Sequence, residues 1–380
     1  MIFYIGDDCP LQALVQFESR LFLDKGWKHK SGAWYKGYST ECVLSERVDD
    51  ILEGYQPAGK WCVIKNEQLY YPVLRGFPVF EKNGDLTNLK IEDFDFVAYH
   101  IQAAPNVETT LSIEEVSSQI CDILTENTEN FYKYNNVDEI TLIYSGGLDT
   151  LTCWAVHEQV NPKFNLSVHL PTETDTTSLL FAGTRRDYQT DVMDLLSATN
   201  WGYEHHCFHK QSNWGISGYY AEAYTYRDIA AITGLAKYFG KEIDELASED
   251  DYYYHFFKRP NLVETFNKIR SEIVIDTENS LRKYLWESFW HDHQFWHLDT
   301  NLVFCPFADI RIPEISFNLS FEDMMKISVN GDIQRNIVRN LRPEYLSLLS
   351  DYKNSGRIFG NFRTNFNESM LHPDTKLIYR

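Results

Sequence analysis

The sequence predicts an α/β protein in which a smaller β-rich N-terminal domain precedes a doubly wound parallel sheet. Residues 1–100 contain short alternating strands with turns, whereas strand-like and helix-like segments alternate from residue 139 onwards. Alternation of this second kind is typical of parallel sheets whose strands are connected by helices. A chain of 380 residues is long enough to bury two cores. We therefore place the two domains at 1–108 and 109–380.

The clearest N-terminal elements are a hairpin and a helix. Residues 61–65 and 69–74 have the composition of two strands, separated by the turn-like segment 65–68. Apolar residues then follow helical spacing over 111–132, where Ser112 and Glu115 have the spacing of a capping box. We expect this helix to lead into the second domain.

The second domain begins with a regular alternation and continues with helices. The predicted strands are 139–144, 165–170 and 203–208. The predicted helices are 150–159, 187–198, 226–240, 262–272, 280–297, 321–328 and 332–350. The part after residue 220 is therefore expected to be largely helical.

The composition limits the classes of function. The chain has 35 Lys and Arg against 55 Asp and Glu, and the resulting net charge of −20 disfavours binding to a nucleic-acid backbone. Its seven cysteines form no Cys-x-x-Cys pair, which indicates reduced thiols. No segment approaches the roughly 18 apolar residues of a membrane helix, and the N-terminus lacks a signal-peptide pattern. We expect a soluble, cytoplasmic protein without a membrane partner.

The strongest local signal is a Ser-Gly-Gly-Leu-Asp-Thr segment between a predicted strand and a predicted helix. This position is the carboxyl edge of the sheet, where ligands of such folds bind. Glycines let backbone amides approach an anion, and the start of a helix adds partial positive charge. A plain strand-to-helix turn is the structural alternative. The residues that we expect to hold a phosphate chain are Ser145, Gly146, Gly147, Leu148, Asp149 and Thr150.

Three side chains of this segment add chemistry. The hydroxyl groups of Ser145 and Thr150 can donate hydrogen bonds to phosphate oxygens. The carboxylate of Asp149 would repel a polyphosphate unless a divalent cation lay between them. Asp149 is therefore our candidate magnesium ligand.

The segment resembles the pyrophosphatase loop of the family that contains asparagine synthetase, β-lactam synthetase and argininosuccinate synthetase. The β-rich domain before the loop is similar to the asparagine-synthetase branch, as are residues 202–206, 305–309 and 330–357. The resemblance implies an adenine nucleotide α-hydrolase-like fold that binds ATP and Mg²⁺. It also implies cleavage of ATP to AMP and pyrophosphate, with Asp149 and Lys353 as catalytic residues and Lys353 contacting the pyrophosphate.

Several matched residues have simpler explanations. Lys353 is equally explained as a solvated surface lysine, and Asp309 is better explained as the cap of a turn. Ordinary strand packing is the favoured explanation for His205 and His206. The resemblance therefore depends on the order of the segments, and each segment alone is a weak signal.

The second acidic motif of the family has only a partial counterpart here. Residues 239–246 can be aligned with it, which implies Asp244 as a second metal ligand, with Asp250 and Asp251 as substitutes. Lys241 stands where the family has an acidic residue or a tyrosine, and the terminal glycines are missing. A polar helix at 241–247, separated from its predecessor by Gly240, is the structural alternative.

The N-terminal domain departs further from the family. Glutamine-using members carry a nucleophilic cysteine directly after the initiator methionine, whereas position 2 here is Ile2. Cys9 could act in this way only after proteolysis. Residues 54–61 and 74–78 nevertheless resemble the core hairpin of that domain in shortened form. We interpret the domain as a degenerate version that draws no ammonia from glutamine.

Three other groups of residues could bind a ligand. His293 and His297 have the helical spacing of a metal pair, although the tryptophans around them favour aromatic packing. Arg185 and Arg186 could meet a phosphate or a carboxylate, or simply lie in a solvated loop. The basic residues near the C-terminus have a spacing that suits a small anion: Arg335, Arg339, Arg342 and Lys353.

Together these observations predict an AMP-forming, ATP-dependent ligase. It would adenylate a small-molecule or peptide carboxylate and transfer the acyl group to an amine, with ATP and Mg²⁺ as cofactors. One alternative is an enzyme that adenylates a carbonyl oxygen of a nucleobase. Another is a binding protein that has kept the loop and lost catalysis.

Overall fold

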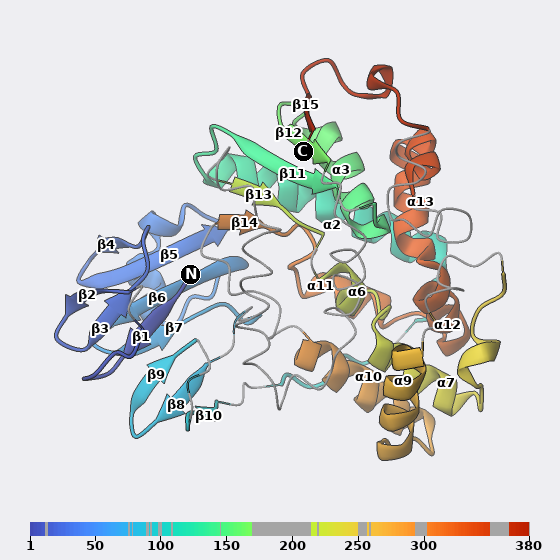
Figure 1. The fold of residues 1–380 in the computed structure, drawn as a ribbon, viewed down its shortest axis with the longest axis horizontal. Helices are drawn as coiled ribbons and strands as arrows, with labels where there is room; N and C mark the ends of the chain where they lie inside the picture. The colour runs from blue at the N-terminus through green and yellow to red at the C-terminus, as the bar shows by residue number, and fades with distance from the viewer. Residues whose placement is uncertain are drawn as a thin grey trace.

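The computed structural model shows two antiparallel sheets on one side of the molecule, and a parallel sheet with most of the helices on the other (Figure 1). The predicted order of a β-rich part followed by an α/β part is therefore confirmed. No helix in the described part of the chain has both the length and the apolar character that crossing a membrane requires. The structure describes all residues except 12–13, 75–76, 78, 89–90, 92, 98–100, 108, 145, 169–213, 219, 250–256, 258–259, 293–301, 350–364 and 380.

The N-terminal part consists of a six-stranded sheet in the order β10-β8-β9-β1-β3-β2 and a four-stranded sheet in the order β4-β5-β6-β7. All paired strands in both sheets are antiparallel. The strands of the first sheet are β1 (Phe3–Ile5), β2 (Val15–Glu18), β3 (Leu21–Leu23), β8 (Phe80–Lys82), β9 (Asp85–Thr87) and β10 (Asp95–Phe96). Those of the second are β4 (Lys28–Lys30), β5 (Ala33–Ser39), β6 (Gly59–Lys65) and β7 (Gln68–Tyr70).

Strand β6 separates two small cores because its side chains alternate between the two faces of the sheet. Cys62 and Ile64 pack with apolar residues of β1 and β3, between the two sheets. Trp61 and Val63 pack on the opposite face, which α1 (Val48–Leu52) covers. The predicted hairpin is confirmed, with β7 ending at Tyr70 rather than at 74. Its turn residues Asn66 and Glu67 have the positive φ values, 50° and 65°, that a tight two-residue hairpin turn needs.

Helix α2 (Ile113–Tyr134) connects the two parts and confirms the predicted capping box. The Ser112 hydroxyl oxygen accepts a hydrogen bond from the Glu115 amide at 3.2 Å, and the Glu115 carboxylate accepts one from the Ser112 amide at 2.9 Å. Tyr38 of β5 packs edge-on against Phe131 of α2, and the Tyr38 hydroxyl oxygen accepts a hydrogen bond from the Cys305 amide at 3.0 Å. The four-stranded sheet is thereby attached to the main core.

The second part is built on a five-stranded parallel sheet in the order β14-β13-β11-β12-β15. Strands β11 and β12 confirm two predicted strands, whereas the predicted helix 187–198 and strand 203–208 lie outside the described residues. The other three strands were not predicted. Two of them, β14 and β15, lie after residue 220, so the expectation of a largely helical chain there was incomplete. The strands are β11 (Ile140–Tyr144), β12 (Asn165–Val168), β13 (Trp214–Ile216), β14 (Leu302–Phe304) and β15 (Lys376–Tyr379).

Three helices, α2, α3 (Leu148–Val160) and α13 (Asp332–Leu341), pack against one another beside this sheet. The predicted helix 332–350 is wrong in one respect. It ends at Leu341, because Pro343 disfavours helical backbone at Arg342, and the chain continues as a 3₁₀ helix, η5 (Pro343–Leu348). The remaining helices in the described residues of this second part are α6 (Ala221–Tyr224), α7 (Ile229–Tyr238), η4 (Ile243–Glu245), α9 (Pro260–Glu272), α10 (Glu278–Asp292), α11 (Arg311–Ser316), α12 (Phe321–Asn330) and η6 (Glu368–Met370).

Candidate functional site

The glycine-rich segment lies where β11 ends and α3 begins, as predicted. Gly146 has φ +79°, a conformation that favours glycine, and Gly147 is the N-cap of α3. Because Gly147 has no side chain, the first-turn amides lack the oxygen that Ser, Thr, Asp or Asn would supply at this position. Ser145 lies outside the described residues. The start of α3 thus combines a helix dipole with an N-cap residue that adds no side chain, which suits an anion.

Two members of the segment have structural roles. The Thr150 hydroxyl donates a hydrogen bond to the Gly147 carbonyl oxygen at 3.1 Å, which stabilises the turn. The Leu148 side chain is buried in the main core. We therefore attribute any contact of these two residues with an anion to their backbone amides.

The chain after β13 closes tightly over the start of α3. A Cβ atom on Gly218 would lie 2.7 Å from the carbonyl carbon of Asp149 and 2.9 Å from the amide nitrogen of Thr150. Only glycine permits this approach, since real Cβ atoms do not come so close to backbone atoms. The carboxyl ends of β11 and β13 therefore meet at this point.

The carboxylate of Asp149 is engaged by two side chains from distant segments. Arg227, in the turn between α6 and α7, places Nη1 2.5 Å from Oδ1 of Asp149. Gln334 of α13 donates from Nε2 to the same oxygen at 3.2 Å, and its Nε2 also lies 3.0 Å from the Thr225 hydroxyl oxygen. The sequence did not indicate Arg227 or Gln334 as site residues. Their side chains connect the turn before α7 and helix α13 to one carboxylate oxygen at the start of α3.

This ion pair is largely withdrawn from water. The Arg227 side chain is 1% exposed and the Asp149 side chain is 18% exposed. Burial raises the pKa of Asp149, whereas the charge and hydrogen bond of Arg227 and the hydrogen bond of Gln334 act in the opposite direction. A bare carboxylate would be unfavourable in these surroundings, so Arg227 is the group that allows Asp149 to stay ionised.

Backbone geometry fixes Arg227 in this place. The preceding residue, Tyr226, is fully buried and has φ +54°, which is uncommon for an aromatic residue. Its carbonyl oxygen accepts a hydrogen bond from the Ser328 hydroxyl. The following residue, Asp228, caps α7 by accepting a hydrogen bond from the Ala231 amide at 2.7 Å. Arg227 is therefore held between two ordered neighbours.

The residues expected to hold magnesium do not come together. Asp244 is exposed in η4, which follows the end of α7. Arg227 precedes the first residue of α7, and its contact with Asp149 lies there. Ten helical residues separate the two ends by about 15 Å. Within the described ranges, no three His, Cys, Asp or Glu side chains form a group that could hold a metal ion. The Arg227 guanidinium already pairs with Asp149. The residues around this carboxylate therefore fit a side-chain cation of the protein better than they fit Mg²⁺.

The segment around Asp244 agrees with the structural alternative in the break at Gly240 but not in the predicted helix 241–247. Gly240 has φ +65° and ends α7, and the residues after it form the short 3₁₀ helix η4 instead of a longer polar helix. The substitutes Asp250 and Asp251 lie outside the described residues. The partial second acidic motif is thus a helix end followed by a turn.

Asp309 confirms its predicted role as the cap of a turn. Its Oδ1 accepts a hydrogen bond from the Arg311 amide at 2.9 Å, and its Oδ2 lies 2.7 Å from Nη2 of Arg311. Arg311 also reaches Glu126 of α2 at 2.8 Å. The candidates outside the described residues are Lys353, Arg185, Arg186, His205, His206, His293 and His297.

The cysteine nearest the N-terminus has no sign of activation. Burial raises the pKa of the Cys9 thiol, which disfavours the thiolate that a nucleophile requires. Its Sγ lies 3.8 Å from the Leu11 carbonyl oxygen. At position 2, the Ile2 amide donates to the Asp24 carboxylate at 2.9 Å. Both residues thus have local structural contacts in the N-terminal part.

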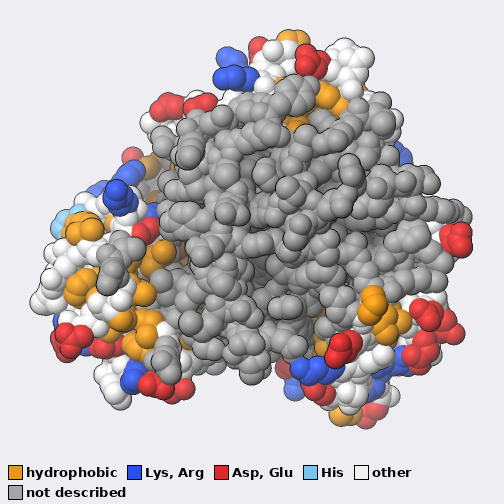
Figure 2. Space-filling view, viewed as in Figure 1, with side chains coloured by type: hydrophobic (Ala, Val, Ile, Leu, Met, Phe, Trp, Pro, Cys, Tyr) orange, Lys and Arg blue, Asp and Glu red, His pale blue; other side chains and the backbone are white. Residues whose placement is uncertain are grey.

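Three of the four basic residues of the C-terminal region lie in the described part of the chain, and each has a partner within the protein. Arg335 donates from Nε to the Asn330 carbonyl oxygen at 2.8 Å, and Arg339 bonds to the Asn336 side chain at 2.5 Å. Arg342 instead pairs with two carboxylates, those of Glu158 and Glu344. The described part of the face in Figure 2 likewise shows basic and acidic side chains next to one another.

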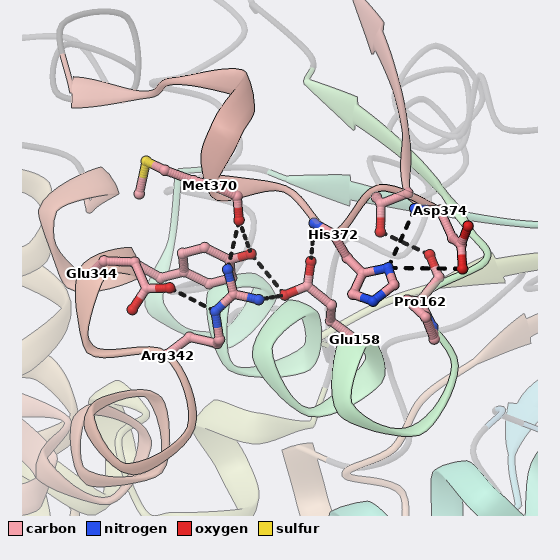
Figure 3. Close-up of polar contacts among 9 residues, drawn as sticks. Glu158, Pro162, Arg342, Glu344, Met370, His372 and Asp374 are labelled. Carbon is pink, nitrogen blue, oxygen red and sulfur yellow. Dashed lines mark hydrogen bonds and ion pairs between the residues drawn. The ribbon is translucent and has the colours of Figure 1, made fainter.

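Glu158, near the end of α3, is the centre of this second network (Figure 3). Its side chain is 3% exposed and pairs with Arg342. It also accepts hydrogen bonds from the Tyr345 hydroxyl at 2.7 Å and from the His372 amide at 3.0 Å. The carbonyl oxygen of Met370 receives a further bond from Arg342 at 2.5 Å. One buried carboxylate thus ties the segment before β15 to α3.

In comparisons with known proteins, no family model and no curated protein matched the chain. The case for a function therefore rests on the residues of the loop and on their arrangement at the sheet edge.

Proposed function

We propose that the chain is an AMP-forming, ATP-dependent ligase. In this proposal the phosphates of ATP bind at Ser145–Thr150. The observation that carries this proposal is the geometry between β11 and α3. A left-handed glycine, Gly146, is followed by an N-cap without a side chain, and both lie at the carboxyl end of a parallel strand. This is the arrangement by which helix starts bind phosphate groups.

The position of β11 in the sheet supports the same proposal. Strand β11 has β12 on one side and β13 on the other, although both follow it in the sequence. In open α/β sheets, ligands bind in the crevice outside the carboxyl ends of strands where the connections diverge in this way. We propose that the sheet is doubly wound and adenine nucleotide α-hydrolase-like, with ATP across the ends of β11 and β13.

The chemistry that we propose has two steps. An oxygen of the substrate carboxylate attacks the α-phosphorus of ATP, the bond from that phosphorus to the bridging oxygen breaks, and pyrophosphate leaves. The nitrogen of an amine then attacks the acyl carbon, loses a proton, and displaces AMP to form an amide. Backbone amides of the loop hold the phosphates, and Lys353 is proposed to stabilise the leaving pyrophosphate. Catalysis would depend on positioning and charge stabilisation.

The arrangement around Asp149 also supports a second candidate. Arg227 and Gln334 both engage Oδ1 of Asp149, and Asp244 lies at the far end of α7. The second candidate is a protein that binds ATP without converting it to products. Such a protein would tolerate the loss of a metal site formed by Asp149 and Asp244. The two candidates differ in one property, since only the ligase releases pyrophosphate when a carboxylic acid is added.

The test is acid-dependent release of pyrophosphate from ATP, measured with a panel of carboxylic acids and an amine. Gly146→Ala should abolish the release, because a side chain is strained at φ +79°. Gly84→Ala is the matched control. Gly84 also has positive φ, +87°, but it lies in the β8–β9 turn with open space around it. Equal activity of both variants would contradict the role of the loop.

A further inference from the structure

We infer that Arg227 does for Asp149 what a magnesium ion would otherwise do, so that the loop binds ATP without a metal ion held by the protein. The inference rests on the proposed function and concerns the cofactor requirement of the same site. The sequence implied Asp244 as the second metal ligand beside Asp149, whereas the fold brings Arg227 and Gln334 to Asp149.

The position next to Asp149 already contains a cation. Arg227 Nη1 is 2.5 Å from Oδ1, and Gln334 supplies a second donor to that oxygen. Arginine remains protonated at any physiological pH, so its charge on Asp149 is permanent. A divalent ion on the remaining oxygen of the carboxylate would lie beside this guanidinium and be repelled by it.

The fold also prevents Arg227 from making way for a metal ion. Gly331, between α12 and α13, has φ +67°, and a Cβ atom there would lie 3.2 Å from Nε of Arg227. The side chain is 1% exposed, so the surrounding protein encloses it in its present position. Moving it away would leave a buried arginine and a buried carboxylate without each other, which is strongly unfavourable.

The burial of Arg227 defines what it can do for a nucleotide. Arg227 is less exposed than Asp149, so it acts on an incoming phosphate through the carboxylate that it neutralises. The phosphates then meet a neutral ion pair and the positive end of α3, and Asp149 no longer repels them. Arg227 is thus a positioning and neutralising residue.

The test is calorimetric titration of the full chain with ATP, once with excess EDTA and once with excess MgCl₂. The wild-type dissociation constant should change by less than about threefold between the two conditions, because the neutralising charge belongs to the protein. Arg227→Gln should weaken binding in EDTA by about 10–100-fold, the equivalent of one charge-assisted interaction. Magnesium should restore much of the loss, since Asp149 then lacks a counter-charge. Arg227→Lys should keep most of the binding in EDTA.

Arg311→Gln is the matched control, because Arg311 also pairs with a buried carboxylate, that of Asp309, which does not belong to the loop. It should bind ATP as the wild type does in both conditions. Wild-type binding that requires magnesium would overturn the inference and leave the proposed function standing. A complete lack of ATP binding in both conditions would overturn both. The wild-type comparison decides the matter even if Arg227→Gln fails to fold.

Discussion

Asp149 and Arg227 are 78 positions apart in the sequence, yet Arg227 Nη1 lies 2.5 Å from the Asp149 carboxylate. The pair joins the first turn of α3, which follows β11, to the start of α7, which follows β13. The contact thereby connects the segments that follow the carboxyl ends of β11 and β13, two neighbouring strands of the parallel sheet. The stability of the candidate loop and its electrostatic character both depend on this contact.

Asp149→Asn should lower the free energy of unfolding by about 3 kcal/mol, because it leaves the buried Arg227 without a counter-charge. The double variant Asp149→Asn with Arg227→Gln should lose less than the sum of the two single variants, since it removes both charges together. Urea denaturation of the four proteins gives the coupling energy. Strictly additive losses would show that the pair is not energetically coupled.

Gly331→Ala should be more destabilising than Gly240→Ala. Both glycines have left-handed backbone, φ +67° and +65°, so the conformational strain of about 1 kcal/mol is common to both. A Cβ atom on Gly331 would also lie 2.6 Å from Cδ2 of Leu148, whereas Gly240 faces open space. Chemical denaturation measures the difference, and ATP affinity should fall only in Gly331→Ala. Equal losses of stability would show that the contact with Leu148 relaxes without cost.

Acidification should destabilise the protein through His157. Burial lowers the pKa of His157 to about 3, so the folded state keeps the imidazole neutral, whereas the unfolded chain takes up a proton near pH 6.5. The contribution of His157 is therefore complete above about pH 6.5 and is lost as the pH falls towards 3. At pH 5.0 the loss should reach about 2 kcal/mol, at 1.4 kcal/mol per pH unit.

Comparison of the wild type with His157→Gln isolates this contribution, because the other titrating groups are common to both proteins. Glutamine can keep a hydrogen bond to the Tyr132 hydroxyl, which lies 2.6 Å from Nε2 of His157. The stability difference between the two proteins should shrink between pH 7.5 and pH 5.0. Parallel stability profiles would mean that His157 does not titrate on unfolding.

Glu158→Gln should loosen the segment before β15, because it removes the charge that pairs with Arg342. The expected loss is about 3 kcal/mol. Glu344→Gln is the matched control, since Glu344 pairs with the same arginine but is 45% exposed, and it should cost less than about 1 kcal/mol. Hydrogen exchange of the His372 amide, which donates to Glu158, is the local measurement. Unchanged protection of that amide in Glu158→Gln would contradict the role of the network.

Local signals in the sequence predicted the elements that depend on local interactions. The capping box of Ser112 and Glu115 marked the start of α2, and the glycines at 146 and 147 marked the junction between β11 and α3. The break after α13 was also present in the sequence, because Pro343 restricts the residue before it. That proline explains why α13 ends at Leu341 and not at 350.

Long-range features gave no comparable signal. Strands β13 and β14 have three residues each, too few for a period of two to be recognised, and β15 comes from the end of the chain. Arg227 and Gln334 are 78 and 185 positions from Asp149, and only the folded sheet brings them to it. Arg227 lies directly before the N-cap of α7, Asp228, inside the helix that was predicted for 226–240.

The most direct test of the proposed ligase uses a carboxylic acid from the panel that stimulates pyrophosphate release, labelled with ¹⁸O in its carboxylate. If the carboxylate attacks the α-phosphorus of ATP, mass spectrometry should find one ¹⁸O atom in the AMP, together with an equal amount of pyrophosphate. AMP without the label, or ADP and phosphate as the products, would contradict the proposed reaction.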